Sequence, residues 1–374
     1  MSDEGGKPGA PAAPYGQWLS AAAVGTIGGG TAALIGLPVP WLVGSLISGL
    51  ITSVFLGRRL SVPAPFLAIA QCAIGLTVGL SFSIDTITSL GRAFPAVILV
   101  LTATTAASLA NGYLLSKWTE IDRSSGLLGS IPGAASAMVA AADKVGADAR
   151  AVAVLQYVRL LFILIVVPPL LAAWTDPSQS TAVATMDLPV EAATNRAPWF
   201  ILLPGLALLG LAGALLGQRL RFPSPYVLGP MTLSMGLGTL FPDVAAAGFS
   251  VPPAIFAAAL LVIGTSVGLR FDKEVLGTLR RAVAIQLLLL LGLLGVSAVL
   301  AFLLYSITEI DLETAVMGNI PGALEGMIAV SMDLGASAAI VAAMHTMRSV
   351  SLLCVGPWIV RGLQRAPQGQ RPAA

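Results

Sequence analysis

Apolar runs long enough to cross a lipid bilayer recur along nearly the whole chain. A helix needs about 20 apolar residues to cross the ~30 Å hydrocarbon core, and runs of about 18 residues or more occur throughout these 374 residues. Apolar residues make up 56% of the sequence and charged residues only 10%, whereas about 25% charged residues is usual in soluble domains. The sequence therefore predicts an all-α integral membrane protein with many spans.

The apolar runs form two sets of five, which divide the chain into two repeats. The first set lies near 18–36, 38–56, 64–82, 93–116 and 151–174, and the second near 198–216, 224–241, 252–270, 282–305 and 335–360. Between the fourth and fifth run of each set lies a weaker segment, 126–142 or 315–332. We expect a disordered cytoplasmic tail 1–16, a first repeat 17–174, an external linker 175–197, a second repeat 198–361 and a cytoplasmic tail 362–374.

The two repeats are copies of one another. They align without a gap from Gly75 to Pro168 and from Gly264 to Pro357, at an offset of 189 residues. Upstream, Pro38-Val39-Pro40-Trp41 matches Pro223-Ser224-Pro225-Tyr226 at an offset of 185 residues. The match covers almost all of the apolar sequence, so we conclude that the chain arose by internal duplication.

An Ile-Pro-Gly motif lies inside each weaker segment. It reads Gly129-Ser130-Ile131-Pro132-Gly133-Ala134 in the first repeat and Gly318-Asn319-Ile320-Pro321-Gly322-Ala323 in the second. A backbone break at membrane depth is tolerated only where protein or a water-filled cavity supplies hydrogen-bond partners. Proline fits the first turn of a helix, and Ser130 and Asn319 are common N-cap types. We therefore expect a helix to begin at each motif, with an extended arm 126–131 before the first one.

The Lys and Arg residues decide between two topologies, because cytoplasmic loops are enriched in both residue types. Five spans per repeat, with the motif segment as a re-entrant hairpin, place 16 of the 20 Lys and Arg residues in the cytoplasm, two outside and two within the membrane. Six spans per repeat divide the loop charges evenly. The sequence thus predicts ten transmembrane helices, two re-entrant half-helix hairpins, two inverted five-span repeats and both termini in the cytoplasm.

Inverted hairpins bring two helix N-termini together near the bilayer centre. Free N–H groups at a helix N-terminus attract anions, and discontinuous helices in inverted repeats are typical of secondary transporters. The predicted substrate-binding residues are Ser130, Ile131, Pro132, Gly133, Arg159, Asn319, Ile320, Pro321, Gly322 and Arg348, and the predicted coupling residues are Glu325, His345 and Gln156.

The roles of these polar residues stay open at this point. Arg159 and Arg348 occupy equivalent intramembrane positions, where arginine is costly and a functional candidate; alternatively, each pairs with backbone carbonyls and serves assembly. His345, which is equivalent to Gln156, either couples protons or is a hydrogen-bonded structural residue. Glu325 replaces a serine of the first repeat, which suits a coupling carboxylate. The Thr-Glu-Ile-Asp stretches at 119–122 and 308–311 are expected to be caps or hairpin anchors.

Several classes of function find no support in the sequence. One histidine in the whole chain argues against a histidine-rich metal centre, and we find no nucleophile–base pair, so we expect no enzyme, no cofactor and no metal site. Charge pairs such as Arg280-Arg281 fit inside loops, and no nucleic-acid-binding element is recognisable. The expected partners are the lipid bilayer and a small anionic substrate, and the sequence is compatible with a homodimer.

At these residues the chain resembles the AbrB-type membrane protein family, whose members carry an internal duplication and are often labelled ammonia monooxygenase-like or regulatory. The matching stretches, each with a second copy, are Pro38-Val39-Pro40-Trp41-Leu42-Val43-Gly44, Leu128-Gly129-Ser130-Ile131-Pro132-Gly133, Gly146-Ala147-Asp148 and the run Gln156…Arg159…Pro168. The second copy departs at Ser337 and His345. The regulatory label implies an effect on gene expression, whereas a copper oxidation site needs more nitrogen ligands than one histidine supplies.

Two hypotheses follow for function. The first is a secondary transporter of a small organic anion in the bacterial cytoplasmic membrane, working by alternating access around the paired half-helices. The second is a membrane-embedded sensor that regulates gene expression through a partner and binds a signal in the same cavity. Flux across a membrane distinguishes them.

Overall fold

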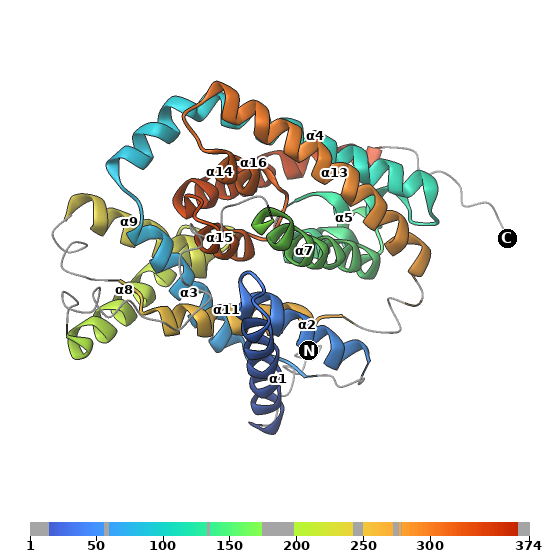
Figure 1. The fold of residues 1–374 in the computed structure, drawn as a ribbon. Coiled ribbons are helices and arrows are strands. Elements are labelled where there is room, and N and C mark those ends of the chain that lie inside the picture. The colour runs from blue at the N-terminus through green and yellow to red at the C-terminus, as the bar shows by residue number, and fades with distance from the viewer. Residues whose placement is uncertain are drawn as a thin grey trace, which may run out of the picture.

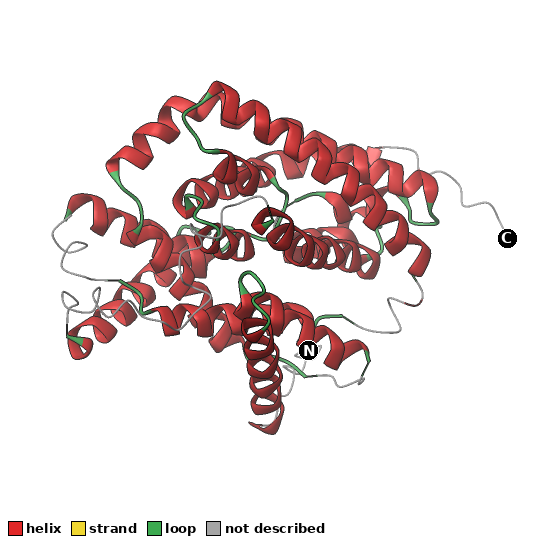
Figure 2. Cartoon of the chain, in the orientation of Figure 1, coloured by secondary structure: helices red, strands yellow, loops and turns green. Residues whose placement is uncertain are grey.

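The computed structural model describes the backbone of residues 15–55, 60–132, 135–173, 198–241, 250–271, 277 and 279–365. Within these ranges the chain is helical and contains no strand (Figure 2). The expected tails lie almost wholly outside the described residues, and the linker 175–197 and Gly133 lie outside them entirely.

The helices repeat at the same offsets as the sequence. The first half contains α1 (Tyr15–Leu34), α2 (Pro40–Val54), α3 (Ala64–Leu80), α4 (Ile84–Trp118), α5 (Arg123–Ser130), α6 (Ala135–Ala142), the 3₁₀ turn η1 (Asp143–Val145) and α7 (Ala149–Ala172). The second half contains α8 (Trp199–Arg219), α9 (Pro225–Leu240), α11 (Pro253–Gly268), α13 (Arg280–Ile307), α14 (Leu312–Asn319), α15 (Leu324–Asp333) and α16 (Ala338–Arg365). The equivalent pairs are α1/α8, α2/α9, α3/α11, α4/α13, α5/α14, α6/α15 and α7/α16.

Many of these helices suit a bilayer. Helices α4, α7, α8 and α13 are long and apolar enough to cross a membrane, and α1, α2, α3 and α11 are shorter apolar helices. Large apolar side chains such as Leu208 and Leu211 of α8 and Leu291 and Phe302 of α13 are exposed. Because contiguous exposed apolar surface is rare on soluble monomers, lipid is the medium that fits this surface, and the protein is a multi-pass helical membrane protein.

The helices form two groups that are joined through a few elements. Helices α1, α2, α3, α8, α9 and α11 pack on one another and are called the scaffold bundle here. Helices α4 to α7 and α13 to α16 form the hairpin bundle, which occupies the upper part of the view in Figure 1. The main contacts between the two bundles join α3 and α11 to α7, α15 and α16.

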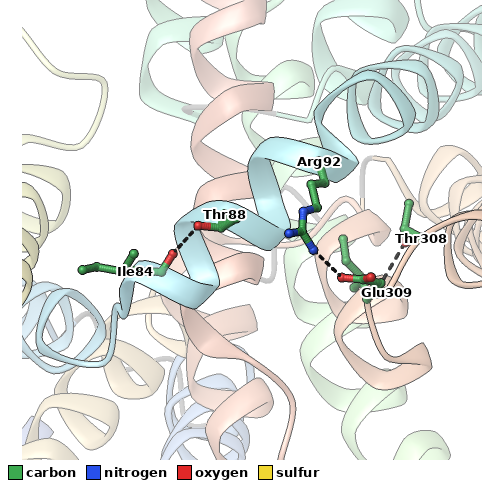
Figure 3. A network of polar contacts seen from close by, with 6 residues as sticks. Ile84, Thr88, Arg92, Thr308 and Glu309 are labelled. Atoms are coloured by element: carbon green, nitrogen blue, oxygen red, sulfur yellow. Dashed lines mark hydrogen bonds and ion pairs between the residues drawn. The ribbon is translucent and has the colours of Figure 1, made fainter.

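The equivalent helices α4 and α13 run antiparallel to each other. Arg92 is near the start of α4 and Glu309 is just after the end of α13. The Nη1 atom of Arg92 lies 3.5 Å from Oε2 of Glu309 (Figure 3). At the opposite end, Glu120 follows α4 and lines a cavity together with Arg281 at the start of α13. Arg92 is equivalent to Arg281, and Glu309 to Glu120. The two equivalent pairs therefore occupy corresponding places at opposite ends of α4 and α13, one as an ion pair and the other as two residues that line one cavity.

The scaffold bundle shows the same correspondence between the halves through close glycine contacts. A Cβ atom added at Gly75 of α3 would collide with the carbonyl oxygen of Val227 in α9. A Cβ atom at Gly264 of α11 would collide with the carbonyl oxygen of Leu42 in α2. Both members of each contact are equivalent across the duplication, so small residues let the backbones approach in the way that is common between membrane helices.

We expect Gly75→Ala and Gly264→Ala each to lower the thermal unfolding temperature of the purified protein. Overpacking of this kind costs about 1–3 kcal/mol, because backbone atoms cannot move aside as a flexible side chain can. Gly91→Ala and Gly292→Ala are matched controls, since an added Cβ has no neighbour within 4 Å at either position. Equal melting curves for all four variants would contradict this packing.

Each segment that carries the Ile-Pro-Gly motif turns back on itself. The Asp148 N–H, just before α7, donates to Ser125 Oγ near the start of α5 over 2.8 Å. In the second half the Ser337 N–H, just before α16, donates to Thr314 Oγ1 near the start of α14, also over 2.8 Å. The entry and the exit of each segment thus lie side by side. The pair α5/α6 and the pair α14/α15 are hairpins of two short helices, called hairpin 1 and hairpin 2.

Two local predictions about these hairpins are wrong. Residues 126–131 are not an extended arm, because α5 runs to Ser130. Ser130 and Asn319 are not N-caps, since each is the last residue of its helix, and the next helices begin at Ala135 and Leu324. The side chain of Asn319 instead bonds to Thr104 of α4 and donates to the Ser297 carbonyl of α13 over 2.7 Å. At Asn319, partners on other helices override the local capping preference.

The prediction of caps or hairpin anchors at the Thr-Glu-Ile-Asp stretches is confirmed. Asp122 is the N-cap of α5 and accepts a hydrogen bond from the Ser125 N–H over 2.9 Å. Asp311 is the N-cap of α14 and accepts from the Thr314 N–H over 2.7 Å. Ser125 and Thr314, whose N–H groups these caps accept from, also accept a hydrogen bond from the N–H at the exit of each hairpin. The caps therefore hold the entry and the exit of each hairpin together.

Candidate functional site

The two Ile-Pro-Gly breaks meet at one cavity between the bundles. Its volume is about 340 Å³. The scaffold bundle contributes residues from α3, α11 and the loop before α9, while the hairpin bundle contributes residues from the two motifs, α7, α15 and α16. Pro132 of hairpin 1 and Gly322 of hairpin 2 both line it. Residues from opposite ends of the chain are therefore brought to one place.

In the first half, two side chains of α7 hold the end of α5. Helix α5 ends at a proline-containing break, which leaves its last carbonyls without helical partners. The Gln156 amide donates to the carbonyl of Leu128 over 2.7 Å and to that of Ile131 over 3.0 Å. Arg159 donates to the Ser130 carbonyl over 2.9 Å and to Gln156 Oε1 over 2.7 Å. Together they satisfy the C-terminal end of the half-helix.

In the second half, α16 holds the end of α14 in the same way. Arg348 donates to the carbonyl of Gly318 over 2.9 Å and to those of Asn319 and Ile320 over 3.3 Å. Nε2 of the His345 ring lies 3.1 Å from the Met317 carbonyl oxygen, and its Nδ1 lies 3.3 Å from Nη2 of Arg348. Both side chains are buried.

The two arginines have features of both roles considered from the sequence, which are assembly and substrate binding. Arg159 and Arg348 bond to backbone carbonyls at the hairpin tips, which is the assembly role. Both also line the cavity. A guanidinium group has five N–H donors, so capping a helix end does not use up its capacity to bind. These cations are held in place by the fold and face the same space.

Glu325 lies in the first turn of α15 and faces the scaffold bundle. The Gln71 amide of α3 donates to Glu325 Oε1 over 2.9 Å. Residues 322–326 line the cavity, and Ala323, the N-cap, supplies no side-chain cap. The N-terminus of α15 therefore opens on the cavity with its partial positive charge, next to the carboxylate of Glu325.

Sequence reasoning missed a third cation and its aromatic partner at the cavity. Arg270, just after α11, donates to the Tyr157 hydroxyl over 2.8 Å, and its guanidinium carbon lies 5.2 Å from the centre of that ring. Arg270 is exposed, whereas Arg159 and Arg348 are buried. From the sequence alone, Arg270 is one of the Lys and Arg residues expected in cytoplasmic loops. Only the packing of α11 against α7 places it at the site.

The cavity carries a positive balance of charge. Its charged lining residues are Arg159, Arg270, Arg348 and Glu325, which give a net charge of +2 with His345 neutral. Among the residues that the structure describes, no group of three His, Cys, Asp or Glu side chains could hold a metal ion. Cations surrounded by low-dielectric walls attract an anion strongly.

The predicted site residues fall into two layers around this cavity. Those that line it are Pro132, Gln156, Arg159, Gly322, Glu325, His345 and Arg348. Those that are buried without lining it are Ser130, Ile131, Asn319, Ile320 and Pro321. The second group lies at the breaks after α5 and α14 and includes Ser130, Asn319 and Ile320, whose carbonyls the arginines bind.

Comparison with known proteins agrees with the resemblance seen in the sequence. A family model described as "Transition state regulatory protein AbrB" matches residues 9–364. The "Putative regulator AbrB" of Escherichia coli (strain K12) is 31% identical over 331 residues, which cover 87% of this chain and 90% of that protein. The "Uncharacterized protein YhjN" of Bacillus subtilis (strain 168) is 24% identical over 349 residues, 90% of each chain.

One solved structure covers nearly the whole chain at low similarity. The sodium proton antiporter MjNhaP1 from Methanocaldococcus jannaschii, at pH 8, aligns with 95% of this chain and 98% of its own, at 15% sequence identity and a TM-score of 0.29. A score this low does not establish a common fold.

Proposed function

The chain belongs to the AbrB family, and we propose that it works as a secondary transporter of small organic anions. The observation that carries the proposal is the cavity itself. Two broken helices meet there, three arginines and one glutamate line it, and the N-terminus of α15 opens on it. Half-helix termini that face a cavity between repeats are the usual binding device of such transporters.

We further propose ten spans, two re-entrant hairpins and inverted repeats in the bacterial cytoplasmic membrane. The adjacent ends of each hairpin support a re-entrant path. The antiparallel arrangement of α4 and α13 supports inversion. The distribution of Lys and Arg supports cytoplasmic termini. In this topology Arg270 and Pro223–Pro225 lie on the cytoplasmic side, so the cavity faces inward.

Flux through proteoliposomes tests this function. The purified protein is reconstituted and loaded in turn with labelled mono- and dicarboxylates, under imposed proton and sodium gradients. We expect saturable uptake of at least one anion above the rate of protein-free liposomes. No flux of any anion under any gradient would overturn the proposal.

Arg270→Ala is expected to raise the KM for the transported anion about threefold to tenfold, with little change in kcat. An exposed cation at a cavity mouth attracts the anion without contacting it throughout transport, so the effect should shrink as ionic strength rises. Arg219→Ala is the control, because Arg219 is exposed at the end of α8 and does not line the cavity. An equal change in both variants would argue against a role for Arg270 in capturing the anion.

A sensor that regulates gene expression is the second candidate. The description of the matched family and the printed name of the Escherichia coli relative favour it. It requires binding in the same cavity without flux, together with a partner protein. Binding of an anion measured by calorimetry in a protein that shows no uptake would favour the sensor. We propose neither a catalytic step nor a cofactor for this chain.

A further inference from the structure

A buried hydrogen bond joins the two bundles at the loop before α2. The Val39 N–H donates to Asp333 Oδ2 over 2.8 Å. Val39 is the N-cap of α2, in the scaffold bundle, and Asp333 ends α15, in the hairpin bundle. In the topology given above, both residues lie on the outer side of the membrane. The bond therefore crosses the boundary between the bundles on the side opposite to the open cavity.

The conformation at this contact is strained. Val39 has φ 47° and ψ 53°, in the left-handed region, which a β-branched residue seldom adopts. The carboxylate of Asp333 is buried, and its Oδ1 atom has no hydrogen-bond partner among the described residues. An unpaired buried polar atom and a strained backbone both make a contact costly. This contact is therefore less stabilising than an unstrained contact with every buried polar atom hydrogen-bonded would be.

The equivalent place in the other half is open. Ser224, the counterpart of Val39, has φ −133° and lines the cavity, whereas Val39 is only 1% exposed. Lys144, the counterpart of Asp333, is exposed. Two copies of one sequence thus adopt different arrangements, closed at Val39 and open at Ser224. A protein built from inverted repeats shows this asymmetry when it is caught in one of two alternating states.

We infer that the contact between Asp333 and Val39 is the outer gate of the protein and that the structure is its inward-open state. The inference rests on the proposed transport function, because a gate is needed only if the cavity opens alternately to the two sides of the membrane. Opening to the outside requires Asp333 to leave Val39. The strain at Val39 keeps the closed state from being too stable, so that the two states can exchange. In the outward-open state the two repeats exchange their conformations. Thr77 then lines the cavity, as its counterpart Ser266 does in this structure.

Two equivalent cysteine reporters test the gate. In a background with Cys72→Ala and Cys354→Ala, Thr77→Cys and Ser266→Cys are placed singly and treated with a membrane-impermeant maleimide from either side. We expect Asp333→Ala to raise outside labelling at residue 77 about tenfold and to lower cytoplasmic labelling at residue 266. Asp333→Asn should resemble the parent protein, because its amide oxygen still accepts from Val39. Glu309→Ala, which removes an exposed acidic residue on the same side, should change neither reporter.

Unchanged labelling in a folded Asp333→Ala protein would overturn the gate, as would an equal effect of Glu309→Ala. If Asp333→Ala does not fold, the double variant Val39→Cys and Asp333→Cys decides. An oxidant should then cross-link the pair and block outside labelling at residue 77, and reductant should reverse both effects. Failure to cross-link would overturn the contact. Labelling needs no substrate, so a gate that responds in a protein without flux would refute transport and leave the conformational change standing.

Discussion

Arg348→Gln is expected to abolish most anion uptake while the protein keeps its fold. The amide of Gln156, one turn before Arg159 on α7, reaches the carbonyls of Leu128 and Ile131. A glutamine at position 348 keeps an amide N–H donor on the side of α16 that faces the end of α14, but it brings no charge to the cavity. Hydrogen bonds to charged groups contribute about 1.5–3 kcal/mol, so we expect uptake to fall about 10- to 100-fold.

Arg348→Ala is the companion variant that separates the two roles of this residue. Among the described residues it removes the only donor to the carbonyls of Gly318 and Asn319, whereas the Ile320 carbonyl keeps its bond from the Gly322 N–H. Each buried carbonyl without a partner costs about 1–3 kcal/mol, so this variant should lose thermal stability as well as uptake. Uptake and unfolding temperature are measured on the same preparations. If Arg348→Gln transports normally, the arginine acts only as a helix cap.

Glu325→Gln is expected to uncouple transport from the ion gradient. It removes the one negative side chain among the described residues that line the cavity and keeps a carbonyl oxygen that can accept the hydrogen bond from Gln71. Because a neutral amide neither takes up a proton nor balances a cation, gradient-driven accumulation should fall about 100-fold. Exchange of labelled for unlabelled anion needs no gradient and should continue.

The control for this variant is Gln71→Leu, which leaves the carboxylate in place and removes its partner on α3. It should weaken coupling much less than Glu325→Gln does. If both variants lose accumulation and exchange alike, Glu325 positions hairpin 2 and carries no coupling charge. If Glu325→Gln accumulates anion like the parent protein, the coupling group lies elsewhere.

Apolar patterning and the repeat were sufficient to predict several features of the fold. The span-length runs predicted an all-helical membrane protein, because an apolar surface of that length has no stable place in water. The offsets of 189 and 185 residues predicted the helix-by-helix match between α1–α7 and α8–α16. The proline in each motif predicted a break, since proline cannot continue a helical hydrogen-bond ladder.

The sequence by itself thus determined where the helices, the breaks and the intramembrane arginines lie, because these depend on local chemistry and on the period of the pattern. Only the tertiary structure decided that Ser130 and Asn319 end helices, that Gln156 and Arg348 hold the broken ends, and that Arg270 reaches the cavity. It also decided that the Val39 N–H is hydrogen-bonded to Asp333, whereas the equivalent Ser224 lines the cavity. These features depend on partners far apart in the chain, and two copies of one sequence can settle into different packings when neighbouring bundles hold them differently.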